Sequence, residues 1–194
     1  MKTKSLHIIL VMLLLPVFFG CDKNFEEINT DPTQLSRETM KFEYLFTSAQ
    51  VSSSGNSDGY ANGIWQAGLA YASTMIQHLS STSTFWYGDK YVYNATYSGF
   101  YWKGQYTTAI KSISDVIENT REKEQQKNLY NISRIFRCFL FQRLTDVYGD
   151  LPYKNAGKGY LNGTVNPPYD RQQDIYLDML NELDQAAIAL NPQA

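Results

Sequence analysis

The chain has 194 residues, of which 43% are hydrophobic and 19% charged, and its formal net charge is −2. Because there is no excess of basic residues, we expect no nucleic-acid partner and no phosphate-binding surface. The whole sequence has 2 histidines, so the commonest general base and metal ligand is scarce. We therefore expect a protein that is not an enzyme and that has neither a metal site nor a cofactor.

The N-terminus has a short apolar run, residues 6–21, behind the basic residues Lys2 and Lys4. These features are typical of a secretory signal peptide, and the run is shorter than the ~20 residues of a membrane-spanning helix. We expect residues 1–20 to be removed and Cys21 to carry lipid, so that the chain is anchored to a membrane and folds outside the cytoplasm. The alternative is a plain secretory signal whose cysteine is incidental. Removal of Lys2 and Lys4 leaves 15 of the 17 basic residues against 19 acidic ones, a formal charge of −4.

Residues 21–40 are polar and are interrupted by Asp31-Pro32, which predicts a lipidated tether and an irregular lead-in. Residues 41–194 form the predicted helical domain. Its first three helices are indicated by apolar residues at steps of three and four. These residues are Phe42, Leu45, Phe46 and Ala49; then Ile64, Ala67, Gly68, Tyr71, Met75 and Leu79; then Tyr106, Ala109, Ile110, Ile113, Val116 and Ile117.

Two further helices follow the charged segment 121–127. Gly149 and Pro152 are expected to end the fourth helix, and Asp170 is predicted to cap the fifth, with Gln173 as its capping-box partner. The predicted buried faces are Leu129, Ile132, Ile135, Phe136, Phe139, Leu140, Leu144 and Val147 in the fourth helix, and Ile175, Met179, Leu183, Ala186 and Leu190 in the fifth.

The predicted fold is all-α, an irregular stack of antiparallel helix pairs. Trp102, four residues before Tyr106, is similar to the opening of a tetratricopeptide unit, although no strict 34-residue repeat is present. Cys138 lies in the apolar pattern of the fourth helix, so we expect a buried and unreactive thiol.

Several motifs suggest chemistry that their surroundings do not support. Residues 55–59 match the G-x-S-x-G pattern of a hydrolase, but a flexible turn explains them better, because no strand precedes the serine. The segment 54–65 also resembles a calcium loop, with Trp65 where the bidentate glutamate belongs. Asp146 and Asp150 suggest paired carboxylates, although turn chemistry accounts for Asp150. A hydrolase is therefore the least favoured alternative.

Aromatic residues are densest between residues 85 and 106. Those at helical steps, Tyr97, Tyr101, Trp102 and Tyr106, are predicted to be core residues. The others lie around a predicted turn at residues 88–90, where rings that stay exposed could bind the apolar faces and hydroxyl edges of sugars. Phe85 belongs to this group, and the ligand-binding candidates in it are Trp86, Tyr87, Tyr91 and Tyr93.

Three segments together resemble the SusD/RagB family of surface nutrient-binding lipoproteins of Bacteroidota-type bacteria. The first is residues 21–32, which is similar to the lipidated lead-in and surface-export signal of that family. The second and most specific is residues 134–153, which ends in Leu144-Thr145-Asp146-Val147-Tyr148-Gly149-Asp150-Leu151-Pro152-Tyr153. The third is residues 168–176, continuing to residues 183–186.

This resemblance implies a tetratricopeptide-like scaffold at the cell surface of the outer membrane. It also implies a partner, a SusC-like, TonB-dependent transporter, to which the protein passes oligosaccharides. Two alternatives stay open: a peptide-binding RagB-type protein, and a docking scaffold for the transporter that binds no ligand itself. The family's chains are much longer, so this chain is expected to be an N-terminal part whose fold is incomplete at its C-terminal end. Cys21 is the one site residue that the resemblance transfers.

Overall fold

The computed structural model of the chain describes residues 24–31, 40–54, 63–82 and 86–190. The signal peptide, Cys21, Phe85 and the G-x-S-x-G segment therefore lie outside the described residues. No helix within the described ranges has both the length and the apolar character needed to cross a membrane. The chain divides into two compact units, residues 1–40 and 41–194. In the first unit, the short helix α2 (Phe25–Asn29) has no buried residue.

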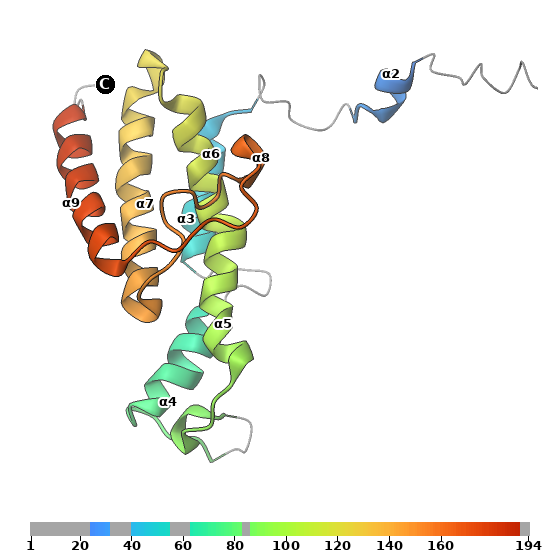
Figure 1. Cartoon of the computed structure of the whole chain (residues 1–194). Helices are drawn as coiled ribbons and strands as arrows, with labels where there is room; N and C mark the ends of the chain where they lie inside the picture. The colour runs from blue at the N-terminus through green and yellow to red at the C-terminus, as the bar shows by residue number, and fades with distance from the viewer. Residues whose placement is uncertain (1–23, 32–39, 55–62, 83–85, 191–194) are drawn as a thin grey trace, which may run out of the picture. The chain divides into compact units, whose positions relative to one another are not determined.

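The second unit is built from helices (Figure 1). Among its described residues there is no β-strand, only an isolated bridge between Leu151 and Asp170, so the all-α prediction is confirmed. The segments η2 (Gly63–Ala72) and η4 (Gln105–Ile110) are π-helical, and η3 (Gly88–Lys90) and η5 (Glu124–Gln126) are 3-10 turns. The elements are α3 (Phe42–Ser53), η2 (Gly63–Ala72), α4 (Ser73–Met75), η3 (Gly88–Lys90), α5 (Ala95–Gly104), η4 (Gln105–Ile110), α6 (Lys111–Thr120), η5 (Glu124–Gln126), α7 (Lys127–Tyr148), α8 (Gly159–Asn162) and α9 (Gln172–Ala189).

Helix α7 packs against α6 and α9, and α3 packs against α6. The segments α5, η4 and α6 follow one another without a break and form one long rod beside α7 (Figure 1). Ile113, Phe141, Leu144 and Ile175 are completely buried where these helices meet. Complete burial of side chains of this size is worth about 1.5 to 3 kcal/mol each, so these contacts hold the helices together.

The predicted buried face of α7 is only partly right. Leu140 and Leu144 are completely buried, but Ile132, Phe139 and Val147 are exposed to 42%, 46% and 65%. The buried surface of α7 also includes polar residues, because the helix is covered from more than one side and hydrogen bonds satisfy most of these groups. Cys138 is buried as predicted, and the buried residues of α7 that the prediction did not include are Asn131, Ser133, Arg134, Phe141 and Thr145.

Asp170 does not cap α9, contrary to the prediction. Its carboxylate accepts the backbone N–H groups of Tyr153 at 3.1 Å and Lys154 at 2.9 Å. Instead, the Asp150 carboxylate accepts the N–H of Gln172, the first residue of α9, at 2.9 Å. Asp170 thus holds the start of the segment that connects α7 to α9, and Asp150 holds the start of α9.

The structure also tests the predicted buried face of α9 and the predicted core aromatics. In α9, Ile175, Met179 and Ala186 are buried as predicted, whereas Leu183 is 37% exposed. The predicted core aromatics are confirmed. Tyr97 and Tyr101 are buried, and the rings of Trp102 and Tyr106 pack against the core.

Candidate functional site

The loop after residue 85 lies against η2 and α4 because one glycine permits a very close approach. A Cβ atom on Gly88 would lie 2.0 Å from the Thr74 hydroxyl oxygen and 2.3 Å from the Tyr71 carbonyl oxygen. No other side chain fits this position without displacing backbone. Next to it, Asn94 accepts the Tyr97 N–H at 3.0 Å and so caps α5. The loop is thereby held at both ends.

The Asp89 carboxylate connects this loop to the segment around Ser81. Asp89 accepts the Ser81 N–H at 3.0 Å and the Lys90 ammonium at 2.9 Å, and Lys90 also donates to the Trp86 carbonyl at 3.0 Å. The Lys90 hydrogen bond, followed by that from Ser81, lowers the pKa of the Asp89 carboxyl. The two charges neutralise each other, so the loop presents no unbalanced charge here.

Trp86 forms a cleft with Trp65 of η2. The two rings meet edge to face, with centroids 5.0 Å apart and planes inclined by 75°. The cleft encloses about 340 Å³, and its floor includes buried Thr74. None of the described residues that line it carries a charge: Trp65, Leu69, Ala70, Thr74, Leu79, Ser80, Ser81, Thr82 and Trp86.

The chemistry of this lining suits a polar ligand with apolar faces. Indole rings offer large rigid apolar surfaces, and Trp65 is 42% exposed. Ser80, Ser81 and Thr82 each bring a hydroxyl that can both donate and accept a hydrogen bond. A sugar ring has the same division into C–H faces and hydroxyl edges.

The structure separates the four aromatic ligand-binding candidates. Trp86 lines the cleft, whereas Tyr87 packs against Tyr97 with ring centroids 6.0 Å apart. Tyr91 and Tyr93 are 62% and 77% exposed and do not line the cleft. Only Trp86 of the four is therefore brought together with a second tryptophan.

Trp65 is a site residue that was not predicted. In the sequence it stands only as a poor match to a calcium ligand, yet Trp65 falls off the predicted apolar stripe of its helix. A tryptophan outside the buried stripe was the available signal. The predicted helix also runs too far: α4 ends at Met75, the backbone of Gln77 is left-handed with φ 60°, and Leu79 lies in the cleft wall instead of the core.

The remaining candidates have structural explanations. Asp150 holds α9, and Asp146 accepts hydrogen bonds from Gln142 and from the Tyr176 hydroxyl. Cys138 is 3% exposed, and burial raises the pKa of its thiol to about 11, which agrees with the predicted unreactive residue. No group of three or more metal-binding side chains occurs among the described residues.

Comparison with known proteins adds a family and two structural relatives. A family model described as SusD-like, starch-binding and associating with the outer membrane, matches residues 34–194. A solved structure named as a Bacteroidetes AC2a SusD-like protein has 27% identity and a TM-score of 0.67, over 80% of this chain and 28% of its own. A structure named as a chitin-binding protein has 33% identity and a TM-score of 0.67, over 78% of this chain and 32% of its own.

No curated protein matches the chain in sequence. The chain spans about a third or less of the length of the two solved relatives. Both share its helical architecture over most of the residues described.

Proposed function

Because this chain belongs to the SusD-like family of starch-binding proteins that associate with the outer membrane, we propose that it binds a neutral glycan at the cell surface. The proposed binding site is the cleft that Trp65 and Trp86 line together. Its pair of indole rings is the observation that carries the proposal, because aromatic rings offer large apolar faces to a ligand. A nucleic-acid base that stacks on such a ring gains about 1 to 3 kcal/mol, and by analogy we expect a similar gain for a sugar ring.

The chemistry of the lining supports a neutral ligand over an acidic one. No charged side chain lines the cleft among the described residues, and Asp89 and Lys90 beside it neutralise each other. The hydroxyls of the 80–82 segment can bind sugar hydroxyls in either hydrogen-bonding direction. The relative named as chitin-binding makes oligomers of N-acetylglucosamine the first ligands to test.

Three further parts of the proposal follow from the family. The protein is anchored through lipid on Cys21, it works beside a SusC-like, TonB-dependent transporter, and it hands its ligand to that transporter without chemical change. The family's described association with the outer membrane supports this placement. Co-purification from detergent-solubilised outer membranes tests the partner, and a panel of chromogenic glycosides tests the absence of hydrolysis.

Affinity gel electrophoresis of the full chain tests the glycan site directly. Gels containing soluble chitin derivatives or starch should retard the wild-type chain, and Trp86→Ala should restore its mobility. Tyr93→Ala is the matched control, because Tyr93 belongs to the same loop but lies outside the cleft. If no polysaccharide retards the wild-type chain, the docking-scaffold alternative is favoured. Retardation by a casein peptide digest alone would favour a peptide-binding protein.

A further inference from the structure

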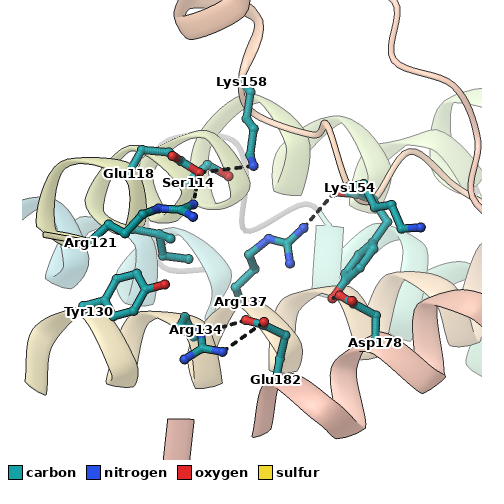
Figure 2. A pocket seen from close by; sticks show the side chains of 12 residues that line it. Ser114, Glu118, Arg121, Tyr130, Arg134, Arg137, Lys154, Lys158, Asp178 and Glu182 are labelled. Atoms are coloured by element: carbon teal, nitrogen blue, oxygen red, sulfur yellow. Dashed lines mark hydrogen bonds and ion pairs between the residues drawn. The ribbon is translucent and has the colours of Figure 1, made fainter. Parts of the chain in front are cut away.

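A second cleft lies between α6, α7, α9 and the segment that follows α7 (Figure 2). It encloses about 190 Å³, less than the ~300 to 1,000 Å³ of sites for drug-sized molecules. A ligand of the size of one sugar ring or a small acid would fill it. Unlike the cleft lined by Trp65 and Trp86, this one is lined mainly by charged side chains.

On the α6 side, one carboxylate is shared by two cations. Glu118 lies 2.8 Å from the Arg121 guanidinium and 3.1 Å from the Lys158 ammonium. Figure 2 shows these three side chains grouped on the same wall. These three side chains together therefore carry a net charge of +1.

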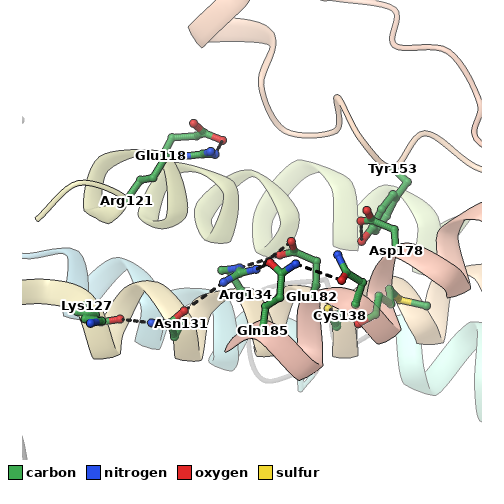
Figure 3. A network of polar contacts seen from close by, with 12 residues as sticks. Glu118, Arg121, Lys127, Asn131, Arg134, Cys138, Tyr153, Asp178, Glu182 and Gln185 are labelled. Atoms are coloured by element: carbon green, nitrogen blue, oxygen red, sulfur yellow. Dashed lines mark hydrogen bonds and ion pairs between the residues drawn. The ribbon is translucent and has the colours of Figure 1, made fainter. Parts of the chain in front are cut away.

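On the α9 side, Arg134 and Glu182 form a bidentate ion pair. Two nitrogens of Arg134 bind the two oxygens of Glu182 at 2.8 and 3.0 Å. The same guanidinium donates to Asn131 at 3.2 Å and to Gln185 at 3.1 Å (Figure 3). Because its donors are engaged on three partners, Arg134 joins α7 to α9 and is a poor ligand anchor.

Arg137 lies between these two walls (Figure 2). Its guanidinium carbon is 4.2 Å from the ring centroid of Tyr153 and 4.7 Å from that of Phe141, which fixes its plane. It donates one hydrogen bond, to the Tyr153 carbonyl at 2.8 Å. No carboxylate in the described part of the chain forms an ion pair with it, so a positioned cation with further N–H donors faces the cleft.

The lining of the cleft as a whole is also positively charged. Lys154 lines the cleft without an ion pair to a described residue, and Asp178 accepts the Tyr153 hydroxyl at 2.7 Å. The lining has five cations and three carboxylates, so its net charge is +2 in a chain of net charge −2. The five cations are Arg121, Arg134, Arg137, Lys154 and Lys158.

We propose that this cleft binds the oxyanion of a small ligand, with Arg137 as its anchor and Lys154 as a second cation. The planar fork of an arginine matches the two oxygens of a carboxylate or a sulfate, and ring stacking has already ordered it. The oxyanion can belong to an acidic sugar or be a free inorganic anion. The site is separate from the proposed glycan cleft and does not depend on it.

Calorimetric titration of the full chain in detergent distinguishes the two sources. The probes are sodium glucuronate, sodium sulfate and, as the neutral match for glucuronate, glucose. We expect at least one anion to bind and glucose not to bind, and binding should weaken at high salt. Arg137→Gln should weaken anion binding at least about tenfold. Arg143→Gln is the matched control, because Arg143 also stacks on two rings of the fold, Tyr101 and Phe139, but lies outside this cleft.

Lys154→Gln keeps the proposal testable if Arg137→Gln does not fold, since Lys154 is exposed. It should weaken anion binding about threefold or more and leave the unfolding temperature unchanged. Glucuronate binding without sulfate binding identifies an acidic sugar, and sulfate binding alone identifies an inorganic anion. The proposal is overturned if neither anion binds, if glucose binds as well as glucuronate, or if anion binding survives Lys154→Gln and Arg137→Gln unchanged.

Discussion

The indole ring of Trp65 stands edge-on to that of Trp86, with ring centroids 5.0 Å apart. The contact joins η2 to the loop that precedes α5, and Gly88 holds this loop against Tyr71 and Thr74. The two indoles form one aromatic surface although they come from separate segments. The geometry of that surface should therefore decide ligand affinity.

Replacing Trp86 by alanine should weaken binding of a chitin oligomer by about 1 to 3 kcal/mol, because one stacking surface is lost. Trp65→Ala should have an effect in the same range. The double variant should lose less than the sum of the two single losses, since the rings also position each other. Titration calorimetry of the four proteins measures this coupling. As the control, Tyr93→Ala should bind with the affinity of wild type. Equal affinity in wild type and Trp86→Ala would show that this cleft is not the glycan site.

Gly88→Ala should destabilise the loop by about 1 to 3 kcal/mol, because the added methyl group clashes with the Thr74 hydroxyl and the Tyr71 carbonyl. Displacement of the loop should also reduce glycan retention. Gly99→Ala is the control, since a Cβ there meets nothing within 4 Å and the residue lies inside α5. That variant should gain about 0.5 to 1 kcal/mol. Chemical denaturation measures both, and equal stabilities would contradict the close packing at Gly88.

Stability should depend on pH through Glu182. Its hydrogen bond with Arg134 lowers the pKa of the Glu182 carboxyl in the folded protein. Because the folded pKa lies below the unfolded value of about 4.3, the stabilisation is complete above that pH. It is lost as the pH falls through the folded pKa. The free energy of unfolding should therefore fall more steeply in acid for wild type than for Glu182→Gln.

At neutral pH, Glu182→Gln should cost about 2 to 3 kcal/mol, below the ~3 to 5 kcal/mol of a fully buried pair, because the Glu182 side chain is 27% exposed. Glu124→Gln is the matched control. Glu124 is 83% exposed and lies 3.8 Å from Lys127, so its loss should change stability by less than about 0.5 kcal/mol. Urea titrations across the acid range would refute the assignment if the two variants behaved alike.

Cys138 should not react with a thiol reagent in the folded chain. Its side chain is buried, and burial raises the thiol pKa to about 11, so little thiolate exists at pH 8. In the variant Cys21→Ser, where Cys138 is the one remaining thiol, a colorimetric disulfide reagent should react only after denaturant is added. Rapid reaction without denaturant would show that α7 and α9 separate readily.

Cys21→Ser should release the protein from the membrane, because two or more acyl chains on Cys21 would give stable anchoring. Cells fed radioactive palmitate should label the wild-type chain and not the variant. The variant Cys138→Ser should keep its label, which controls for acylation at the other cysteine. Persistent label in Cys21→Ser would show that the lipid is attached elsewhere.

The local apolar pattern predicts several helices and the aromatic core, although it extends the helix that begins near residue 64 beyond its end at Met75. Apolar spacing identified α3, α6, α7 and α9, since each helix repeats its buried residues every three or four positions. The same reasoning placed Tyr97 and Tyr101 in the core. It failed at Ile132, Phe139 and Val147, which continue the apolar pattern of α7 but face outward.

The amino-acid sequence is enough to predict helices in the regions of α3, α6, α7 and α9, the resemblance to a family, and the position of Trp86 in a turn-rich aromatic segment. Three features depend on the packing of distant segments: Trp65 meets Trp86, Asp150 instead of Asp170 caps α9, and five cations line one small cleft. Helical periodicity is a relation between residues three or four positions apart. The cleft walls and the cap join segments far apart in the chain, so their pairing depends on how α6, α7 and α9 pack.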